Sequence, residues 1–494
     1  MYYPSLKDFR KKAQHGNLIP VFKSILADME TPVSAYKKID TGEYSFLLES
    51  VEGGEHVGRY SFLGSEPSIL FQSKGNQVCI QDLEAGTTTK FESGYPLGEL
   101  EKLMSRYKPV EVEGLPRFHG GAVGYLSYDA VRFFEELPDS TEDDRGLPDC
   151  FFMITDTLLI FDRVGHRITA VANARVDGDV EGGYQRAIDR VDMLIGKLRN
   201  PLMMPPSKAR RKVTDKVEPQ SNFTQAEYES VVLQAKEYIA AGDIIQVVPS
   251  QRLCTPLSVD TFDVYRALRT VNPSPYMYYL KLGDVQIAGT SPEMMVRVED
   301  GIAETRPIAG TRPRGETSAE DVTLAEELIA DEKERAEHVM LVDLGRNDLG
   351  RVCEFHTVRV SEMMTIERYS HVMHIVSHVV GELRENVTAF DVIRACLPAG
   401  TLSGAPKIRA MEIIDELEPT RRGPYGGAAG YFSFSGNSDT AIIIRTLIVK
   451  DGIAYVQAGG GVVADSVPQT EYGETLNKAQ AVLRAIKLAE AGLE

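Results

Sequence analysis

Cysteine is scarce in this sequence of 494 residues, and its spacing excludes two classes of protein. The five cysteines are scattered, odd in number and never form a C-x-x-C pair: Cys79, Cys150, Cys254, Cys353 and Cys396. This pattern argues against a disulfide scaffold and against a zinc site. We therefore expect a protein of a reducing, cytoplasmic environment.

Long apolar runs are also missing. The segment from Met1 to Gln14 is mixed and polar, without an apolar stretch of signal-peptide length. No later run approaches the roughly 20 apolar residues that a membrane-spanning helix needs. We expect a soluble protein with no membrane partner.

Positive charge is in deficit, because the formal net charge is -18. Such a surface repels phosphate backbones and anionic lipid headgroups, so nucleic acid and membrane partners are disfavoured. Hydrophobic residues make up 43% and charged residues 26%, as in an ordinary globular protein. An enzyme of this charge that acts on an anion must build a local positive site from a metal ion, arginine or lysine.

The chain is long enough for two or three domains, or for one large core with elaborations. The stretch between residues 200 and 222 is rich in proline and charge and has no apolar period. We predict an N-terminal domain over 1–200, a linker over 201–222 and a second domain over 223–494. The basic cluster from Lys208 to Lys212 is interpreted as part of the solvated linker rather than as a nucleic-acid patch.

Short alternating runs predict strands in the first half, at residues 44–48, 68–72 and 158–161, which favours a mostly antiparallel sheet. After the linker, Thr224 and Glu227 form a capping-box pattern that opens a helix, and Gly242 closes it. A strand is expected at residues 244–248.

One stretch of the sequence is nearly repeated, since Gly120–Tyr128 reads GGAVGYLSY and Gly426–Phe434 reads GGAAGYFSF. Glycines inside a strand usually mark a close backbone approach. We predict two packed strands, and we keep a functional role open only for the second copy.

Two pairs of acidic residues have helical spacing. Glu334 and Glu337 lie in a helical pattern from Ala319 to Leu341, and Glu471 and Glu474 open the last helix. Alone, such a pair is usually a solvated helix face. Brought together, the two pairs would offer the carboxylate oxygens that Mg²⁺ prefers.

Several cationic and backbone groups could bind an anion near these acids. Lys478 follows Glu474 by one turn, which fits a substrate contact and an ordinary salt bridge equally well. A strand at 455–458 runs into Gly459–Gly461, whose backbone N–H groups could cradle an anion. Arg445 interrupts an apolar strand pattern over 441–448, and a charge there is costly unless it is paired or binds an anion.

Other polar residues allow more than one interpretation. Glu293 ends a polar turn between two apolar strands, and a carboxyl among apolar neighbours can act as a general acid. The segment from Arg306 to Gly315 gathers three arginines, as an anion site or as an exposed loop. By themselves, His374 and Thr401 would more often be a satisfied histidine and a turn residue.

Nine segments in the C-terminal half occur in one order: GDIIQVVPSQR (242–252), NPSPYMYY (272–279), GTSPE (289–293), RPIAGTRPRG (306–315), EHVMLVDLGRNDLGRV (337–352), HVMH (371–374), LPAGTLSGAPK (397–407), GPYGGAAGYFSF (423–434) and QAGGGVVADSVPQTEYGET (457–475). LLES (47–50) and GRYSFLG (58–64) fit more loosely. This series resembles the chorismate-utilising enzymes and, among them, the large subunits of anthranilate synthases.

The resemblance implies an α+β fold of two large, mostly antiparallel sheets packed as a sandwich with helices outside. It implies that Glu337 and Glu474 ligate Mg²⁺, with Glu334 and Glu471 completing or supporting the site, and that the metal neutralises the ring carboxylate of chorismate. The substrate-binding residues carried over from the family are Gly310, Thr311, Tyr425, Arg445, Gly459, Gly460, Gly461 and Lys478.

The resemblance also implies a reaction. Water-using relatives carry a lysine at Gln246, and relatives that attack the ring covalently carry one at Ala309. Both lysines are absent here, which favours direct amination by ammonia. The family's catalytic positions correspond to Glu293 as general acid, Gln246, Thr401 beside the ring, and His374, which assists the elimination of pyruvate.

The family draws ammonia from a glutamine amidotransferase, and no cysteine here lies in a G-x-C-x-G turn, so a separate amidotransferase subunit is expected. The assembly could be a heterodimer or a heterotetramer. By resemblance, a pocket for feedback inhibition by tryptophan would be formed by Glu49, Ser50, Arg59, Pro275, Tyr276 and Met277. LLES could also be simply the end of a strand.

Two alternatives stay open at this point. An aminodeoxyisochorismate synthase would stop before pyruvate leaves, and a non-catalytic paralogue would bind tryptophan or chorismate as a sensor. The intact Glu293, Glu337 and Glu474 argue against the sensor.

Overall fold

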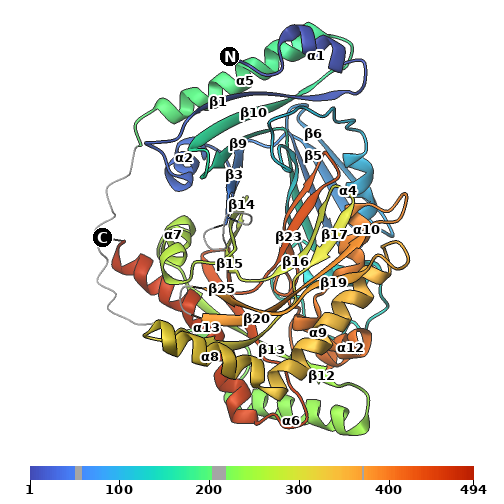
Figure 1. The fold of residues 1–494 in the computed structure, drawn as a ribbon, viewed down its shortest axis with the longest axis vertical. Coiled ribbons are helices and arrows are strands. Elements are labelled where there is room, and N and C mark those ends of the chain that lie inside the picture. The colour runs from blue at the N-terminus through green and yellow to red at the C-terminus, as the bar shows by residue number, and fades with distance from the viewer. Residues whose placement is uncertain (51–57, 203–217, 370–371, 494) are drawn as a thin grey trace.

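Alternating apolar residues from both halves of the chain build two large antiparallel sheets (Figure 1). The computed structural model describes residues 1–50, 58–202, 218–369 and 372–493. Most of the predicted linker, its basic cluster Lys208 to Lys212, and His371 lie outside these residues. The predicted α+β sandwich is confirmed, because a core of side chains from both sheets lies between them.

The first sheet joins the two halves of the chain where β2 pairs with β14, with Leu48 opposite Tyr278. In the described residues its strands are, in spatial order, β1 (Leu18–Leu26), β10 (Arg167–Arg175), β9 (Thr157–Asp162), β3 (Tyr60–Ser65), β2 (Tyr44–Glu49), β14 (Tyr276–Leu282), β15 (Val285–Ser291), β24 (Thr446–Lys450), β25 (Ile453–Gly459), β13 (Ser250–Pro256) and β11 (Gln220–Ser221).

The second sheet also combines both halves. Its described strands are, in spatial order, β18 (Ile308–Pro313), β20 (Val372–Glu382), β17 (Ile302–Thr305), β16 (Met294–Glu299), β23 (Ser438–Ile442), β22 (Ala428–Ser433), β7 (Gly121–Leu126), β8 (Cys150–Thr155), β4 (Ile69–Lys74), β5 (Gln77–Asp82) and β6 (Thr87–Glu92). In addition, β19 (Arg359–Arg368) pairs with β20, and β12 (Gln246–Val247) pairs with β21 (Gly404–Ala405).

The repeated glycine segment explains how the second sheet closes between the halves. Strands β7 and β22 are its two copies, and they pair with each other with Gly124 opposite Gly430. A Cβ at either glycine would collide with a carbonyl of the next strand. The prediction of two closely packed strands is confirmed. The structure also shows that the two copies are direct neighbours in the sheet.

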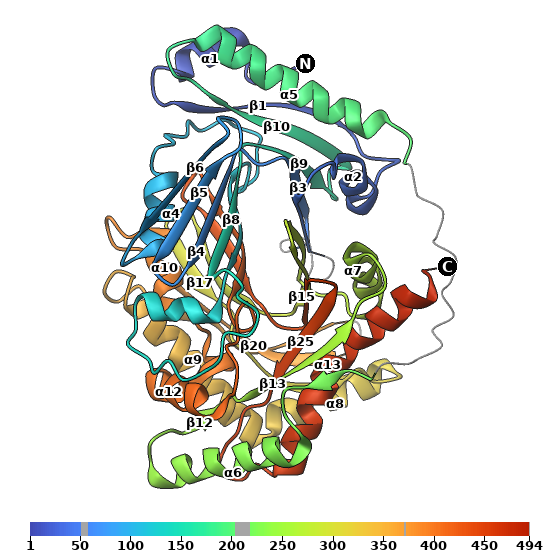
Figure 2. The same ribbon diagram turned by 180° about the vertical axis from the view of Figure 1, so that it is seen from behind.

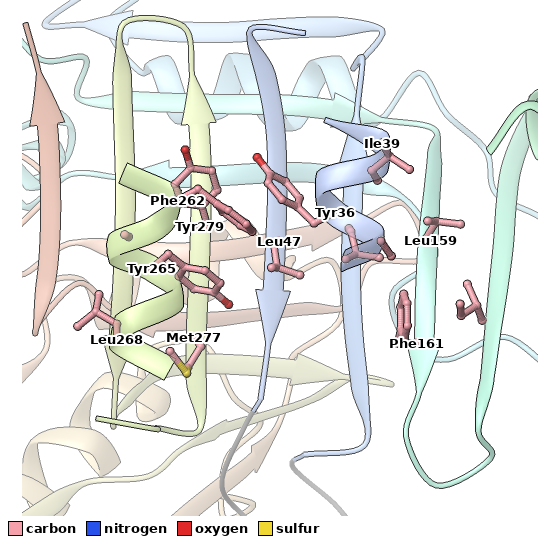
Figure 3. Packing of buried hydrophobic residues seen from close by; sticks show 14 of the residues in the cluster. Tyr36, Ile39, Leu47, Leu159, Phe161, Phe262, Tyr265, Leu268, Met277 and Tyr279 are labelled. Atoms are coloured by element: carbon pink, nitrogen blue, oxygen red, sulfur yellow. The ribbon is translucent and has the colours of Figure 1, made fainter. Parts of the chain in front are cut away.

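Helices cover the outer faces of both sheets. The outer core of the first sheet packs against α1 (Leu6–Lys12), α2 (Pro32–Ile39), α5 (Val180–Arg199), α7 (Thr261–Val271) and α13 (Pro468–Ala491). Figure 3 shows part of this layer, where Tyr36 of α2 and Phe262 and Tyr265 of α7 gather over the strands.

The second sheet has its own helical layer (Figure 2). Its outer core packs against α4 (Pro96–Met104), α9 (Glu332–Gly350) and α10 (Ala389–Cys396). A further cluster joins η1 (Tyr128–Phe133), α6 (Gln225–Ala241) and α12 (Lys407–Leu417). Helix α8 (Ser318–Ala330) packs on β20, and α11 (Gly400–Ser403) contacts α9 and α12.

Local sequence patterns predicted the bounds of some helices and strands correctly and those of others wrongly. The capping box of Thr224 and Glu227 opens α6, and Gly242 closes it with a φ of 86°. The single helix expected over 319–341 is wrong, because the carboxylate of Asp331 accepts hydrogen bonds from two backbone N–H groups and starts α9 as a new helix. The strand expected over 441–448 is also wrong, because β23 ends at Ile442 and β24 begins at Thr446.

A search of the described helices finds none with the length and apolar character that crossing a membrane would require.

Candidate active site

Glu293 is a buried carboxyl at the turn between β15 and β16, with an exposed fraction of 7%. Thr401 of α11 donates a hydrogen bond to it, with 3.1 Å between Oγ1 and Oε1. Burial raises the pKa of Glu293 to about 8, although Thr401 and the charges of Arg445 and Lys478 act to lower it. The side chain is therefore protonated at neutral pH and can donate a proton, as a general acid must.

Arg445 lies in the break between β23 and β24 and has a left-handed φ of 49°. It does not interrupt a central strand, as the sequence had suggested. Its guanidinium makes no hydrogen bond or ion pair to the described residues, although its charge acts on both Glu293 and His374. Because a guanidinium carries five N–H donors, this side chain has free capacity for an anion.

His374 of β20 is held by the strand next to it. Its Nδ1 lies 2.8 Å from the carbonyl oxygen of Gly310 and 3.2 Å from Oγ1 of Thr311. A carbonyl oxygen only accepts, so Nδ1 carries the proton and the lone pair is on Nε2. Burial lowers the pKa of His374, and the nearby charge of Arg445 lowers it further. The ring is therefore neutral at pH 7, with a nitrogen that can accept a proton.

The glycine segment Gly459–Gly461 at the end of β25 brings three polar side chains together. A Cβ placed on Gly459 would lie 3.0 Å from the Tyr425 hydroxyl, and one on Gly461 would lie 2.6 Å from Nε2 of Gln246. Lys478 donates to the Gly459 carbonyl at 3.0 Å, so α13 is fixed to the same segment. Side chains larger than hydrogen would displace these groups.

The two acidic pairs lie on either side of this glycine segment. Glu471 and Glu474 of α13 lie next to Gly460, with a Cβ there 3.2 Å from Oε2 of Glu471 and 4.0 Å from Cδ of Glu474. Glu337 of α9 accepts a hydrogen bond from Nε2 of Gln246 at 3.1 Å, beside Gly461. Glu334 lies nearby, with Oε2 3.1 Å from a Cβ placed on Gly310. Helices α9 and α13 thus present their acids to one region.

The electrostatics of this region favour a cation. Burial raises the pKa of Glu334, and Glu337 adds to the rise. Burial likewise raises the pKa of Glu471, and Glu474 adds to it. The Oε2 atom of Glu471 is buried without a hydrogen-bond partner in the described residues. No three acidic, histidine or cysteine side chains in the described part of the chain stand close enough to form a ready-made metal cluster.

The three arginines of segment 306–315 have carboxylate partners. Arg306 pairs with Glu367, Arg312 pairs with Asp331 at 2.9 Å and Arg314 pairs with Asp321 at 2.8 Å. Most of the segment is strand β18 rather than an exposed loop. Neither interpretation offered from the sequence describes these arginines, whose charges are already compensated by carboxylates.

A separate cavity lies between the two sheets. Its lining includes five residues of the predicted inhibitor pocket: Glu49, Ser50, Pro275, Tyr276 and Met277. The Glu49 carboxylate is held by Tyr265 at 2.6 Å and by Arg269 at 2.9 Å, whereas Oγ of Ser50 is buried without a partner among the described residues. Arg59 does not line the cavity, because it pairs with Asp162 and stacks on Tyr60.

The opposite wall of this cavity carries charged residues that the sequence analysis missed. Asp439 accepts hydrogen bonds from Nη2 of Arg117 at 2.8 Å, from Nε of Arg297 at 3.0 Å and from the Tyr276 hydroxyl at 3.0 Å. Arg297 interrupts an apolar strand run, and that interruption was the available signal. The partner residue could not be read because it lies 142 positions away.

Comparison with known proteins gives consistent findings. A family model described as chorismate binding enzyme matches residues 44–484. The chain is 52% identical to anthranilate synthase component 1 of Acetivibrio thermocellus, covering 100% of this chain and 99% of that protein, and 48% identical to the component 1 of Pseudomonas aeruginosa, covering 99% of both. The crystal structure of anthranilate synthase component I from Streptococcus pneumoniae matches with a TM-score of 0.76 and 37% identity, covering 93% of this chain and 98% of that one.

Proposed function

The chain belongs to the chorismate binding enzymes, and we propose that it converts chorismate and ammonia to anthranilate, pyruvate and water, as its relatives' shared name indicates. The family expected from the motifs is thereby confirmed. The observation that most supports the reaction itself is a protonated, buried Glu293 that interacts electrostatically with Arg445, which forms no ion pair within the described residues. A general acid and an anion-binding cation are the two groups that this substrate requires.

Substrate binding uses the cations and backbone groups around the glycine segment. Chorismate carries two carboxylates, and Arg445 and Lys478 supply positive charge for them. The Tyr425 hydroxyl and the backbone N–H group of Gly461 donate hydrogen bonds, and Gly310 and Thr311 complete the binding surface. The N–H group of Gly459 hydrogen-bonds to Tyr425 and that of Gly460 donates to the Pro249 carbonyl oxygen at 3.2 Å, so these two glycines leave room for the substrate. These groups provide the local positive site that a protein with net charge -18 must build for an anion.

The chemistry follows from the side chains that are present. Ala309 offers no amine to attack the ring, and the Gln246 amide donates to Glu337 and is not a base that could activate water. Ammonia therefore adds directly at C2 while Glu293 protonates the departing C4 hydroxyl, which leaves as water. The C2 proton and the enolpyruvyl group are then lost, the latter as pyruvate, with the Nε2 atom of neutral His374 accepting a proton.

We also propose that Glu337 and Glu474 hold Mg²⁺, with Glu334 and Glu471 supporting the site. The donor set fits, because Mg²⁺ takes hard oxygen ligands, usually one or two carboxylates completed by water and an anionic substrate. Two features support a cation here: the Glu471 oxygen that has no partner in the described part of the chain, and the raised pKa values of Glu334 and Glu471. When bound, the ion would neutralise the ring carboxylate of chorismate.

We propose two further partners. A separate glutamine amidotransferase subunit would supply ammonia, in a heterodimer or heterotetramer, and the relatives' designation as component 1 supports a second component. Tryptophan would bind between the sheets as feedback inhibitor, where one wall is formed by the carboxylate of Glu49 and by the Ser50 hydroxyl, which has no hydrogen-bond partner among the residues that the structure describes.

An ammonia-dependent assay tests this function. The chain is incubated with chorismate and ammonium at pH 8.5, with and without Mg²⁺, and anthranilate fluorescence and pyruvate are followed together. We expect equal amounts of both products. An aminated product without pyruvate would indicate an aminodeoxyisochorismate synthase, and absence of turnover would indicate a binding protein.

The Ser50→Phe variant should remain active but resist tryptophan. A phenyl ring at this buried position fills the cavity between the sheets, and overpacking of about 1–3 kcal/mol predicts a rise of roughly fivefold to more than a hundredfold in the tryptophan concentration for half inhibition. The measurement is ammonia-dependent activity over a tryptophan series. Ser24→Phe, on an exposed position of β1, is the matched control. Unchanged inhibition of Ser50→Phe would place the inhibitor elsewhere.

A further inference from the structure

Two charged residues of the family motifs have no role in the chemistry described above, and the structure joins them. Asp348 lies within the sequence RNDLG (346–350) near the end of α9, and Lys407 ends the sequence SGAPK (403–407) at the start of α12. The Lys407 Nζ lies 2.8 Å from Oδ2 of Asp348, and each side chain is only 13% exposed. This ion pair is therefore largely withdrawn from water, at a desolvation cost that makes it weak evidence for stability alone.

The position of Lys407 is unfavourable for a cation in its own helix. As the first residue of α12 it lies at the positive end of the helix dipole. Its second hydrogen bond, at 3.3 Å, goes to the carbonyl oxygen of Cys396, the last residue of α10. The charge of Lys407 therefore interacts favourably with the C-terminus of α10 and with the Asp348 carboxylate of α9. It gains nothing from the dipole of its own helix, α12.

Lys407 thereby ties together the two ends of the segment 397–406. That segment contains α11, and it is seated on α9 at a second point, since a Cβ on Gly400 would lie 2.6 Å from Cδ1 of Leu344. The next residue is Thr401, whose Oγ1 donates to Glu293. Asp348, Gly400, Thr401 and Glu293 line one small cavity of about 30 Å³.

We propose that the Asp348–Lys407 pair is a positioning device for the general acid: it holds Thr401 against Glu293 by fixing both ends of the segment that carries Thr401. This inference rests on the proposed function of Glu293. Asp348 and Lys407 touch neither substrate nor reacting atoms and act only through Thr401.

The pair acts on proton donation through one hydrogen bond. Thr401 lowers the pKa of Glu293, as do the charges of Arg445 and Lys478, while burial raises it. Removing Lys407 leaves Arg351 as the one cation that acts on the Asp348 carboxylate among the described residues. If the segment then shifts, the Thr401 bond lengthens and the pKa of Glu293 rises. Activity requires protonated Glu293, so the descending limb of the pH profile moves to higher pH.

The test is the pH dependence of kcat/KM for chorismate at constant free ammonia, which reports the free enzyme. We expect Lys407→Met to lower kcat by about ten- to a hundredfold, the scale for a small misplacement of a catalytic group, and to move the descending limb to higher pH. Thr401→Val should move the limb in the same direction. Lys407→Arg, which keeps donors for both partners, should restore the wild-type limb.

The controls separate positioning from folding. Lys487→Met, on an exposed position of α13, is the matched substitution and should leave the profile unchanged. If Lys407→Met folds poorly, the double variant Asp348→Leu with Lys407→Met replaces the pair by apolar side chains and should fold while showing the same shift. If kcat/KM of either folded variant falls at the same alkaline pH as that of the wild type, the proposal is overturned. An active Glu293→Gln enzyme, or a wild-type profile without a descending limb, would instead overturn the role of Glu293 itself.

Discussion

Glu293→Gln should lower kcat for anthranilate formation by about a thousandfold, within the range for loss of a general acid. Glutamine has the same shape and can still accept the hydrogen bond from Thr401, but its amide does not release a proton. The Michaelis constant for chorismate should change little, because Arg445 and Lys478 remain. Steady-state kinetics at pH 7.5 with saturating ammonium and chorismate measure both constants.

The stability of the same variant should depend on pH differently from that of the wild type. Because the pKa of Glu293 is raised in the folded state to about 8, from the ordinary 4.5, the folded protein holds a proton that the unfolded chain releases. Wild-type stability therefore falls as pH rises from about 4.5 to about 8, while Glu293→Gln lacks this loss. The variant should melt at a higher temperature than wild type at pH 9 and close to it at pH 5.

Glu326→Gln, on an exposed position of α8, is the matched control for both measurements and should resemble wild type. If Glu293→Gln kept more than a tenth of the wild-type kcat, another group would have to protonate the leaving hydroxyl.

Features that depend on neighbouring residues could be predicted from the sequence. The capping box of Thr224 and Glu227 is a local pattern and occurs where expected. The polar turn predicted over 289–293 is shorter than expected, because residues 289–291 belong to β15, but Glu293 does lie between two strands. Helical spacing also put each acidic pair on one helix face. These predictions succeeded because the hydrogen bonds and side-chain contacts involved lie within one or two turns of chain.

The failures have a common physical origin. Asp331 divides the predicted helix because its carboxylate competes for the N–H groups of Lys333 and Glu334, while the apolar pattern continues through it. Arg445 lies within an apolar run that reads as one strand, and only the fold shows that its backbone turns there. Apolar periodicity reports which face is buried and is insensitive to a break of one to three residues.

Contacts between distant strands were beyond the sequence altogether. The pairing of β2 with β14, which makes one sheet from both halves, depends on side chains more than 200 positions apart. Arg117 and Asp439 lie 322 positions apart, and neither alone indicates a cavity wall. The family resemblance supplied residue identities, but the joining of Asp348 to Lys407 became visible only in three dimensions.

Glu474→Gln should abolish Mg²⁺-dependent activity while leaving the fold intact. The Glu474 side chain is 44% exposed and its ion pair is with Lys478, one turn away at 2.7 Å. A surface pair of this kind contributes about 0.3–0.5 kcal/mol, so the melting temperature should barely change. For catalysis the loss is larger, because the substitution removes a proposed ligand of the ion and frees Lys478 from its partner. We expect kcat to fall by at least a thousandfold.

Two measurements distinguish a loss of Mg²⁺ binding from a loss of catalysis at an intact metal site. Isothermal titration with Mg²⁺ in the absence of substrate should show binding to wild type and weaker binding to Glu474→Gln, and excess Mg²⁺ should not restore activity. Glu237→Gln, an exposed glutamate of α6, should bind Mg²⁺ and turn over as wild type does. Wild-type Mg²⁺ affinity in Glu474→Gln would remove Glu474 from the ligand set. Because Glu474 and Glu337 reach the same glycine segment from two helices, Glu337→Gln should then be tested alone, as the remaining direct ligand.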